Sequence, residues 1–181
     1  TIAFNVKENN WLGKGKSVGL EIQADEESLI GDFRYTDPNY NFLGNSITYS
    51  FMSERNDKPD LGFENSIISA AVGTSFEQYR DIKVRLGIQA SHDDLQTEDS
   101  ASASLKKQNG TYSELSGNYG FTFDQRDKAF MPTSGSIFSF GQSVPIVADK
   151  SFITNTISSS MYKSLSENIV GSAKIYLASI N

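Results

Sequence analysis

The sequence contains no cysteine, which excludes disulfide scaffolds, zinc–thiolate clusters and cysteine nucleophiles. Its only histidine is His92, and a net charge of −6 argues against a nucleic-acid partner, which would need a basic patch. No apolar run approaches the roughly 20 residues of a membrane helix. That lack does not exclude a membrane, because the strands of membrane barrels are short and apolar on only one face.

Helical periodicity is almost absent, and a period of two recurs instead. In the clearest stretch, 82–90, apolar Ile82, Val84, Leu86, Ile88 and Ala90 alternate with Lys83, Arg85, Gly87 and Gln89. The pattern predicts an all-β fold of ten antiparallel strands, at about 1–8, 16–25, 29–37, 45–55, 62–74, 79–92, 111–125, 135–146, 151–163 and 167–180. All four prolines fall at the ends of these strands or between them, where a missing N–H does little harm.

The connections between the predicted strands alternate in kind. One set is compact and carries aromatics or glycine, as in NNWLGKG and DPNYNFLGN. The other is more acidic and variable, and includes the long stretch DDLQTEDSASASLKKQN. Successive turns of an up-and-down meander lie at opposite ends, so we expect one rim of short turns and one of longer polar loops, as in an outer-membrane barrel. The first residues, TIAFNV, already have a strand pattern and no signal peptide is visible, so we expect the chain to be part of a longer protein.

Alternation alone is also compatible with a soluble β-sandwich, in which the apolar face points inward. Two features favour a transmembrane barrel with a wet interior. First, the polar face carries charged residues that suit a water-filled lumen: Asp32, Arg34, Lys83, Arg85, Glu114 and Lys174. Second, aromatics gather near the short turns as an interfacial girdle would. We assign to these turns and this girdle Trp11, Gly13, Asp37, Pro38, Tyr40 and Phe42.

One hairpin, NYGFTFDQRDKAFMPTSGS at 118–136, carries the most distinctive motif of the sequence. A strand ends in Asp124-x-Arg126-Asp127, and a short turn with Pro132, Thr133 and Gly135 leads into the next strand. This pattern resembles the surface-antigen barrel of outer-membrane protein assembly factors. FNVKENNWLGKG (4–15) and GDFRYTDPNYNFLG (31–44) resemble, in order and spacing, earlier strands and turns of the BamA family within that superfamily.

The resemblance implies a sixteen-stranded barrel preceded by periplasmic POTRA domains, of which residues 1–181 would be a partial barrel domain covering strands 2 to 11. It implies a non-enzymatic function in the outer membrane of a Gram-negative bacterium, namely folding and inserting β-barrel proteins. The implied partners are the lipid bilayer with lipopolysaccharide, unfolded outer-membrane clients and, through POTRA domains outside this chain, assembly lipoproteins. No cofactor is implied. Alternatives from other classes remain: a passive porin-like channel, a related two-partner secretion or translocation transporter, and a soluble β-sandwich adhesin.

The charged cluster at 124–127 invites a catalytic interpretation, but no nucleophile and base accompany it. We predict instead that Arg126 is held by its acidic neighbours and organises the turn, that Pro132 fixes φ, and that Gly135 adopts a conformation that other residues resist. A second cluster, of His92, Asp93, Asp94, Glu98 and Asp99, is a candidate divalent-cation site by residue type. Its spacing matches no calcium loop, so a solvated loop is the expected state.

Overall fold

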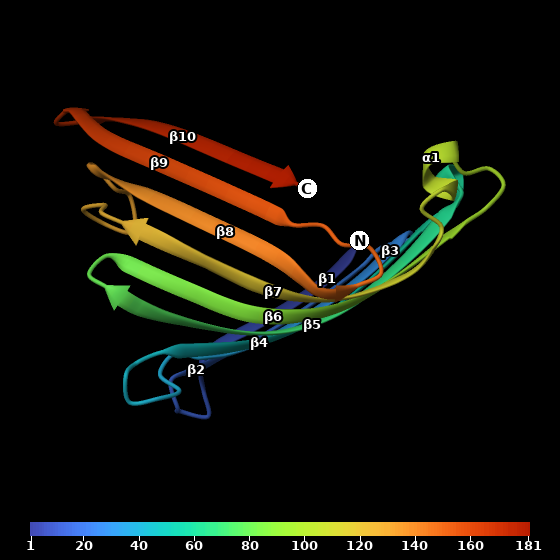
Figure 1. Ribbon diagram of the computed structural model, residues 1–181. Helices are drawn as coiled ribbons and strands as arrows, with labels where there is room; N and C mark the ends of the chain where they lie inside the picture. Colours follow the sequence, from blue (N-terminus) through green and yellow to red (C-terminus); the bar gives the residue numbers. More distant parts are fainter.

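The computed structural model describes residues 1–181 and folds them into a single curved antiparallel sheet (Figure 1). Its ten strands follow one another in order, each paired with the next. They are β1 (Ile2–Trp11), β2 (Lys16–Ala24), β3 (Ser28–Asp37), β4 (Ser46–Lys58), β5 (Phe63–Tyr79), β6 (Ile82–Thr97), β7 (Gly110–Asp124), β8 (Gly135–Ala148), β9 (Thr154–Ser166) and β10 (Ile169–Ile180). The predicted up-and-down meander of ten strands is confirmed.

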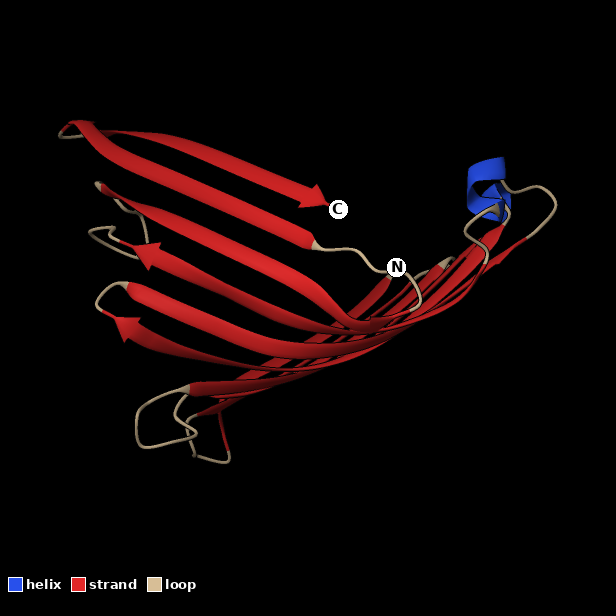
Figure 2. Cartoon of the chain, viewed as in Figure 1, coloured by secondary structure: helices blue, strands red, loops and turns tan.

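Helical structure is confined to two short pieces, the 3₁₀ turn η1 (Pro59–Leu61) and the single turn α1 (Ala103–Lys106), as Figure 2 shows. No helix of the chain is long and apolar enough to cross a membrane. Only 6 of 181 residues are buried, so the sheet has no closed core and both of its faces are open. β1 and β10 are the two edges of the sheet and do not pair with each other.

Strand pairing separates the side chains into two faces, as the alternation predicted. On one face, which we call the apolar face, Leu20 lies opposite Phe33, which lies opposite Phe51. Further along the same face Phe121 packs on Phe138 and Phe140, with ring centroids 5.9 and 5.7 Å apart. The other face, the polar face, presents mainly hydroxyl, amide, charged and glycine positions.

Four glycines on the polar face form two cross-strand pairs. Gly73 pairs with Gly87, and Gly120 pairs with Gly141. A Cβ added at Gly120 would lie 2.5 Å from the Phe140 carbonyl oxygen, and one at Gly87 would lie 3.1 Å from that of Val72. Since neighbouring backbone lies where a side chain would be at Gly120 and Gly87, these two glycines allow adjacent strands to approach closely on the polar face.

The strand ends differ most from prediction at the two longest strands, with shifts of about three residues at β4 and β9. Residues 75–78, predicted as a turn, continue β5, and the turn is made by Arg80 and Asp81, where Asp81 has φ 67°. β6 was predicted to end at His92 but runs to Thr97, with His92 paired to Ile68 and Ser113. Both errors have one cause: backbone pairing continues where apolar alternation stops.

Candidate functional site

The connections form two rims. The turn rim consists of 12–15, 38–45, 80–81, 125–134 and 167–168, and the loop rim of 25–27, 59–62, 98–109 and 149–153. The compact motifs of the sequence all fall on the turn rim. The expected contrast in length is only partial, because 38–45 and 125–134 are not short.

The Asp127 carboxylate builds the turn at 125–134. It accepts hydrogen bonds from the Thr133 N–H at 2.9 Å, the Thr133 hydroxyl at 2.7 Å and the Ser134 N–H at 3.1 Å. The backbone closes the same loop, with Asp127 N–H donating to the Ser134 oxygen. These hydrogen bonds favour the ionised carboxylate and lower the pKa of Asp127 to about 2.

Arg126 forms a fork-shaped ion pair with the last residue of β7. Its Nε donates to Asp124 Oδ1 at 2.8 Å and its Nη2 to Asp124 Oδ2 at 2.7 Å. Its Nη1 also donates to the carbonyl oxygen of Ala129 at 3.3 Å, within the turn. The guanidinium thus ties the strand end to the middle of the turn, and bidentate geometry of this kind fixes orientation as well as supplying energy.

Gly135 begins β8 in a conformation that only glycine adopts easily. Its φ is +94°, and a Cβ there would lie 2.1 Å from the Gln125 oxygen and 2.9 Å from the Arg126 Cα. Met131, the residue before Pro132, has φ +50°, so the turn also holds a non-glycine residue in the left-handed region. The motif residues Asp124, Arg126, Asp127, Thr133 and Gly135 therefore lie together in one compact turn.

The other predicted turn residues lie on the same rim. Trp11 pairs with Lys16 across the first hairpin, and Gly13 has φ +70°. Asp37, just before Pro38, forms an ion pair with Lys16 at 2.9 Å, which joins the hairpins at 12–15 and 38–45. Sequence reasoning missed this bridge because no local pattern connects residues so far apart. Tyr40 and Phe42 are 45% and 97% exposed, so Phe42 projects freely from the turn.

The six charged residues predicted for the lumen all lie on the polar face. Asp32 lies opposite Glu21, and Arg34 opposite Gly19. Lys83 and Arg85 lie on β6. Glu114, on β7, is opposite Ser91, and Lys174, on β10, is opposite Ser160. None of the six takes part in an ion pair. They are spread over β3, β6, β7 and β10, so they do not form one cluster.

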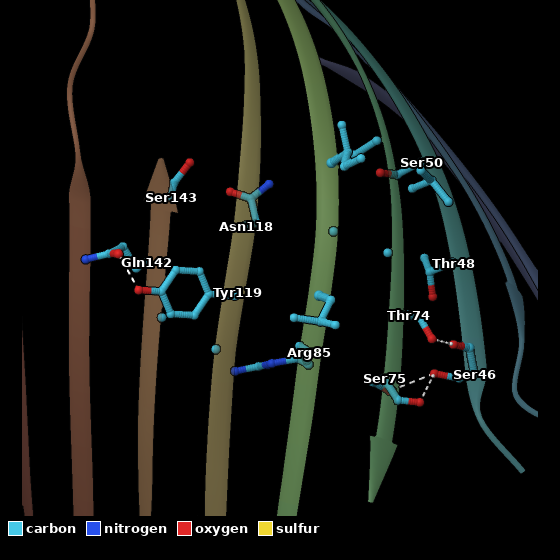
Figure 3. A pocket seen from close by; sticks show the side chains of 18 of the residues that line it. Ser46, Thr48, Ser50, Thr74, Ser75, Arg85, Asn118, Tyr119, Gln142 and Ser143 are labelled. Carbon is cyan, nitrogen blue, oxygen red and sulfur yellow. Dashed lines mark hydrogen bonds between the residues drawn. The ribbon is translucent and has the colours of Figure 1, made fainter. Parts of the chain in front are cut away.

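A hollow of about 510 Å³ lies on the polar face around the two glycine pairs. The polar-face side chains that Figure 3 labels are neutral hydroxyls and amides, with Arg85 as the one charged group; Thr74, Tyr119 and Gln142, also labelled there, belong to the opposite face. Ser46 and Ser75, neighbours on β4 and β5, share a hydrogen bond of 2.6 Å, and the Arg85 guanidinium lies 3.4 Å from the Thr122 hydroxyl. The sequence signal for the hollow is the set of glycines in the strands, which apolar alternation does not reveal.

The cation alternative finds no support in the geometry. No group of three or more His, Asp or Glu side chains is placed to hold a metal ion. His92 and Asp94 lie on the apolar-face side of β6, whereas Asp93 lies on the polar-face side. Most of this segment is strand rather than solvated loop, since only residues from Glu98 onward leave β6.

A family model described as the Omp85 superfamily domain matches residues 10–181. The chain belongs to the Omp85 superfamily. Among solved structures, the crystal structure of BamA from Haemophilus ducreyi lacking POTRA domains 1–3 is similar, with a TM-score of 0.75 and 17% sequence identity over 97% of this chain. The prediction of an Omp85-type wall resembling BamA is confirmed. This chain covers 38% of the length of that BamA chain.

Membership in the Omp85 superfamily indicates what surrounds each face of the sheet. The apolar face is the membrane-facing side of a barrel wall in an outer membrane, and the fold is a ten-stranded part of a transmembrane β-barrel. The apolar stretch Ile82–Ala90 on β6 matches the length of about 9–11 residues that a tilted strand needs to cross a bilayer. A soluble sandwich is thereby excluded.

Proposed function

We propose that this chain forms strands 2 to 11 of a sixteen-stranded outer-membrane barrel that folds and inserts β-barrel proteins in a Gram-negative bacterium. The observation that supports this proposal is the likeness to the BamA wall, which runs through 97% of the chain. In this role the chain carries no catalytic group and no cofactor. Its contribution is a wall of fixed geometry.

The unpaired edges of the sheet, β1 and β10, bear on how the wall would be completed in a membrane. The outer edges of β1 and β10 leave N–H and C=O groups unpaired, at a cost of several kcal/mol for each such group in hydrocarbon. We therefore propose that further strands pair with both edges and close the barrel. Assembly would then use strand addition at an openable seam, where an unfolded client pairs its backbone with an exposed strand edge.

In this proposal each rim of the wall faces a different side of the outer membrane. The turn rim faces the periplasm, where POTRA domains with their lipoproteins deliver clients, and the loop rim faces the lipopolysaccharide leaflet. Asp32, Arg34, Lys83, Arg85, Glu114 and Lys174 face a water-filled lumen. Trp11, Tyr40 and Phe42 lie at the periplasmic interface, and the Asp124–Gly135 turn keeps the seventh and eighth strands of this segment in register.

Depletion of the protein from cells tests the proposal. We expect the heat-resistant, folded forms of several unrelated outer-membrane barrels to disappear on semi-native gels while their unfolded forms accumulate. A depleted strain that keeps normal levels of folded barrels would contradict an assembly function.

One observation favours a second candidate, a channel or transporter. The hollow on the polar face is lined by neutral hydroxyl and amide groups with Arg85, as an aqueous pore lining would be. For a porin-like channel, depletion would lower small-solute uptake and leave folded barrels unchanged. For a two-partner secretion transporter, depletion would stop the export of one secreted protein only.

A further inference from the structure

Four polar side chains lie side by side on the membrane-facing surface. Tyr119 on β7, Gln142 on β8, Asn155 on β9 and Ser179 on β10 are register partners on adjacent strands, and we call them the outer polar row. The Tyr119 hydroxyl donates to Gln142 Oε1 (Figure 3), and Gln142 Nε2 donates to Asn155 Oδ1. Asn155 Nδ2 donates to Ser179 Oγ at 3.4 Å. The apolar face thus contains an unbroken chain of polar groups across four strands.

Tyr119 and Gln142 are set among apolar residues in the middle of their strands, whereas Asn155 and Ser179 lie near the loop-rim ends of β9 and β10. Along β7 and β8 the row is flanked on the turn-rim side by Phe121 and Phe140, and on the loop-rim side of β8 by Val144. Along β9 and β10, Ile157 and Leu177 lie next to it. Polar groups are costly in hydrocarbon unless they are hydrogen-bonded, so any donor or acceptor that the bonds within the row leave unused calls for a partner.

The hydrogen bonds within the outer polar row leave several donors and acceptors unused. Three donors remain free, namely one N–H of each amide and the Ser179 hydroxyl hydrogen. Acceptor lone pairs also remain on the oxygens of Tyr119, Gln142, Asn155 and Ser179. A matching ligand therefore presents groups that both donate and accept hydrogen bonds, such as amides and hydroxyls.

An apolar trough begins at Tyr119. It measures about 520 Å³ and is lined by no charged residue. Its apolar side chains come from β4 to β8: Ile47, Val72, Leu86, Ile88, Val144 and Ile146. Gly117, opposite Ile88, lies on the same face, where its missing side chain deepens the surface. A trough of this kind beside a row of hydrogen-bonding groups suits an amphiphile whose acyl chain lies in the trough.

The depth of the row narrows the choice of lipid. The same register row runs on through Leu86 and Thr74 to Ile47, beside the turn rim, so it descends from the loop rim at Ser179 toward the turn rim. Three steps of about 4.8 Å between strands tilted by about 40° place Tyr119 roughly 9 Å deeper than Ser179. Glycerophospholipids carry acceptors only near the headgroup. Hydroxylated, amide-linked acyl chains carry them deeper.

We propose that the outer polar row and its trough bind one lipid A moiety of lipopolysaccharide, with an acyl chain in the trough and amide or hydroxyl oxygens against Gln142 and Asn155. The choice of leaflet rests on the rim orientation proposed above. A neighbouring barrel is the less suitable partner, because the outward faces of barrels present few acceptors.

Native mass spectrometry of the complete protein tests the site, using hexa-acylated lipid A and dipalmitoyl phosphatidylethanolamine as probes. We expect the double variant Gln142→Leu/Asn155→Leu to retain about tenfold less lipid A, because two hydrogen bonds are lost, with phosphatidylethanolamine unchanged. The matched control is Ser143→Ala/Thr154→Val, on the same strands but on the polar face, which should bind like wild type.

A second variant, Val72→Trp on β5, fills the trough from a strand that carries no member of the row and should also reduce lipid A retention. Heat-modified mobility on gels verifies that each variant is folded. Equal lipid A retention by wild type and the two row and trough variants would overturn the proposal. So would equal losses of both lipids, or loss of a co-purifying protein with lipid A binding intact, since that would make the surface a protein interface. These lipid readouts do not depend on whether the protein assembles barrels.

Discussion

The turn at 125–134 and the loop at 98–109 are the two longest connections of the wall, and they are held in different ways. The turn is fixed by its own residues, through the carboxylates of Asp124 and Asp127. The loop has local hydrogen bonds too, such as that from the Leu105 N–H to the Ser102 hydroxyl, but it is also attached to a neighbouring connection. Glu98 N–H donates to the Gly62 oxygen at 2.8 Å, and Ala101 is only 7% exposed. The turn can therefore be recognised from its sequence motif, whereas the position of the loop depends on contact with the connection at 59–62.

The sharpest test of the turn is Gly135→Val. The new Cβ would lie 2.1 Å from the Gln125 oxygen, at a φ of +94° that β-branched residues avoid. We expect a loss of about 3 kcal/mol or more, seen as absence of the heat-resistant form on semi-native gels. Gly13→Ala is the matched control, since Gly13 also has positive φ but nothing lies within 4 Å of its Cβ. Arg126→Lys should fold better than Gly135→Val, and equal folded yields of the two would contradict this account.

The corresponding change on the loop is Gly62→Ala. Its Cβ would lie 2.2 Å from Ser100 Oγ and 2.7 Å from the Ala101 nitrogen, so the loop must move away. We expect faster hydrogen exchange and proteolysis within 98–109, while the barrel keeps its heat-resistant mobility. If the barrel failed to fold, the loop would be as essential to the wall as the turn, and the contrast would be lost.

The acid response of the turn comes from Asp127. Its pKa is lowered to about 2, below the unfolded value of about 3.9, so its contribution to stability is fully present above pH 4 and is lost as the pH falls toward 2. In urea unfolding, Asp127→Asn should lower the midpoint at pH 6 and should match wild type near pH 2. A difference between the two proteins that is independent of pH would show that the carboxylate charge is irrelevant.

The smallest expected effect is at the loop rim. The Lys150 ammonium lies 3.7 Å from the centroid of the Tyr112 ring. Lys150→Met removes this cation–π contact and should cost about 0.5–1 kcal/mol in urea unfolding. The same substitution made with Tyr112→Leu should cost no more than Tyr112→Leu alone; additive losses would show that the pair does not interact.

Prediction from the sequence succeeded where neighbouring residues determine the outcome. Alternation gave the strand order and both faces, and the Asp-x-Arg-Asp and Pro-Thr-x-Gly pattern located the turn. Prediction failed where pairing with a neighbouring strand determines the structure of a segment. Residues 93–97 carry Asp93, Asp94 and Gln96, yet they remain strand because β5 and β7 pair with them beyond the apolar layer. The Lys16–Asp37 bridge, the docked loop and the outer polar row likewise depend on register between strands.

The glycine pairs on the polar face have a consequence for how the strands find their partners. A slip of two residues between neighbouring strands keeps every side chain on its proper face, so apolar alternation cannot reject it. Glycine positions can oppose such a slip. Backbone oxygens of the neighbouring strands lie only 2.5 Å from a Cβ built at Gly120 and 3.1 Å from one at Gly87. A slip of β6 would place Arg85 or Gln89 in the position of Gly87, opposite Gly73. Crowding at these two positions therefore disfavours a misaligned pairing.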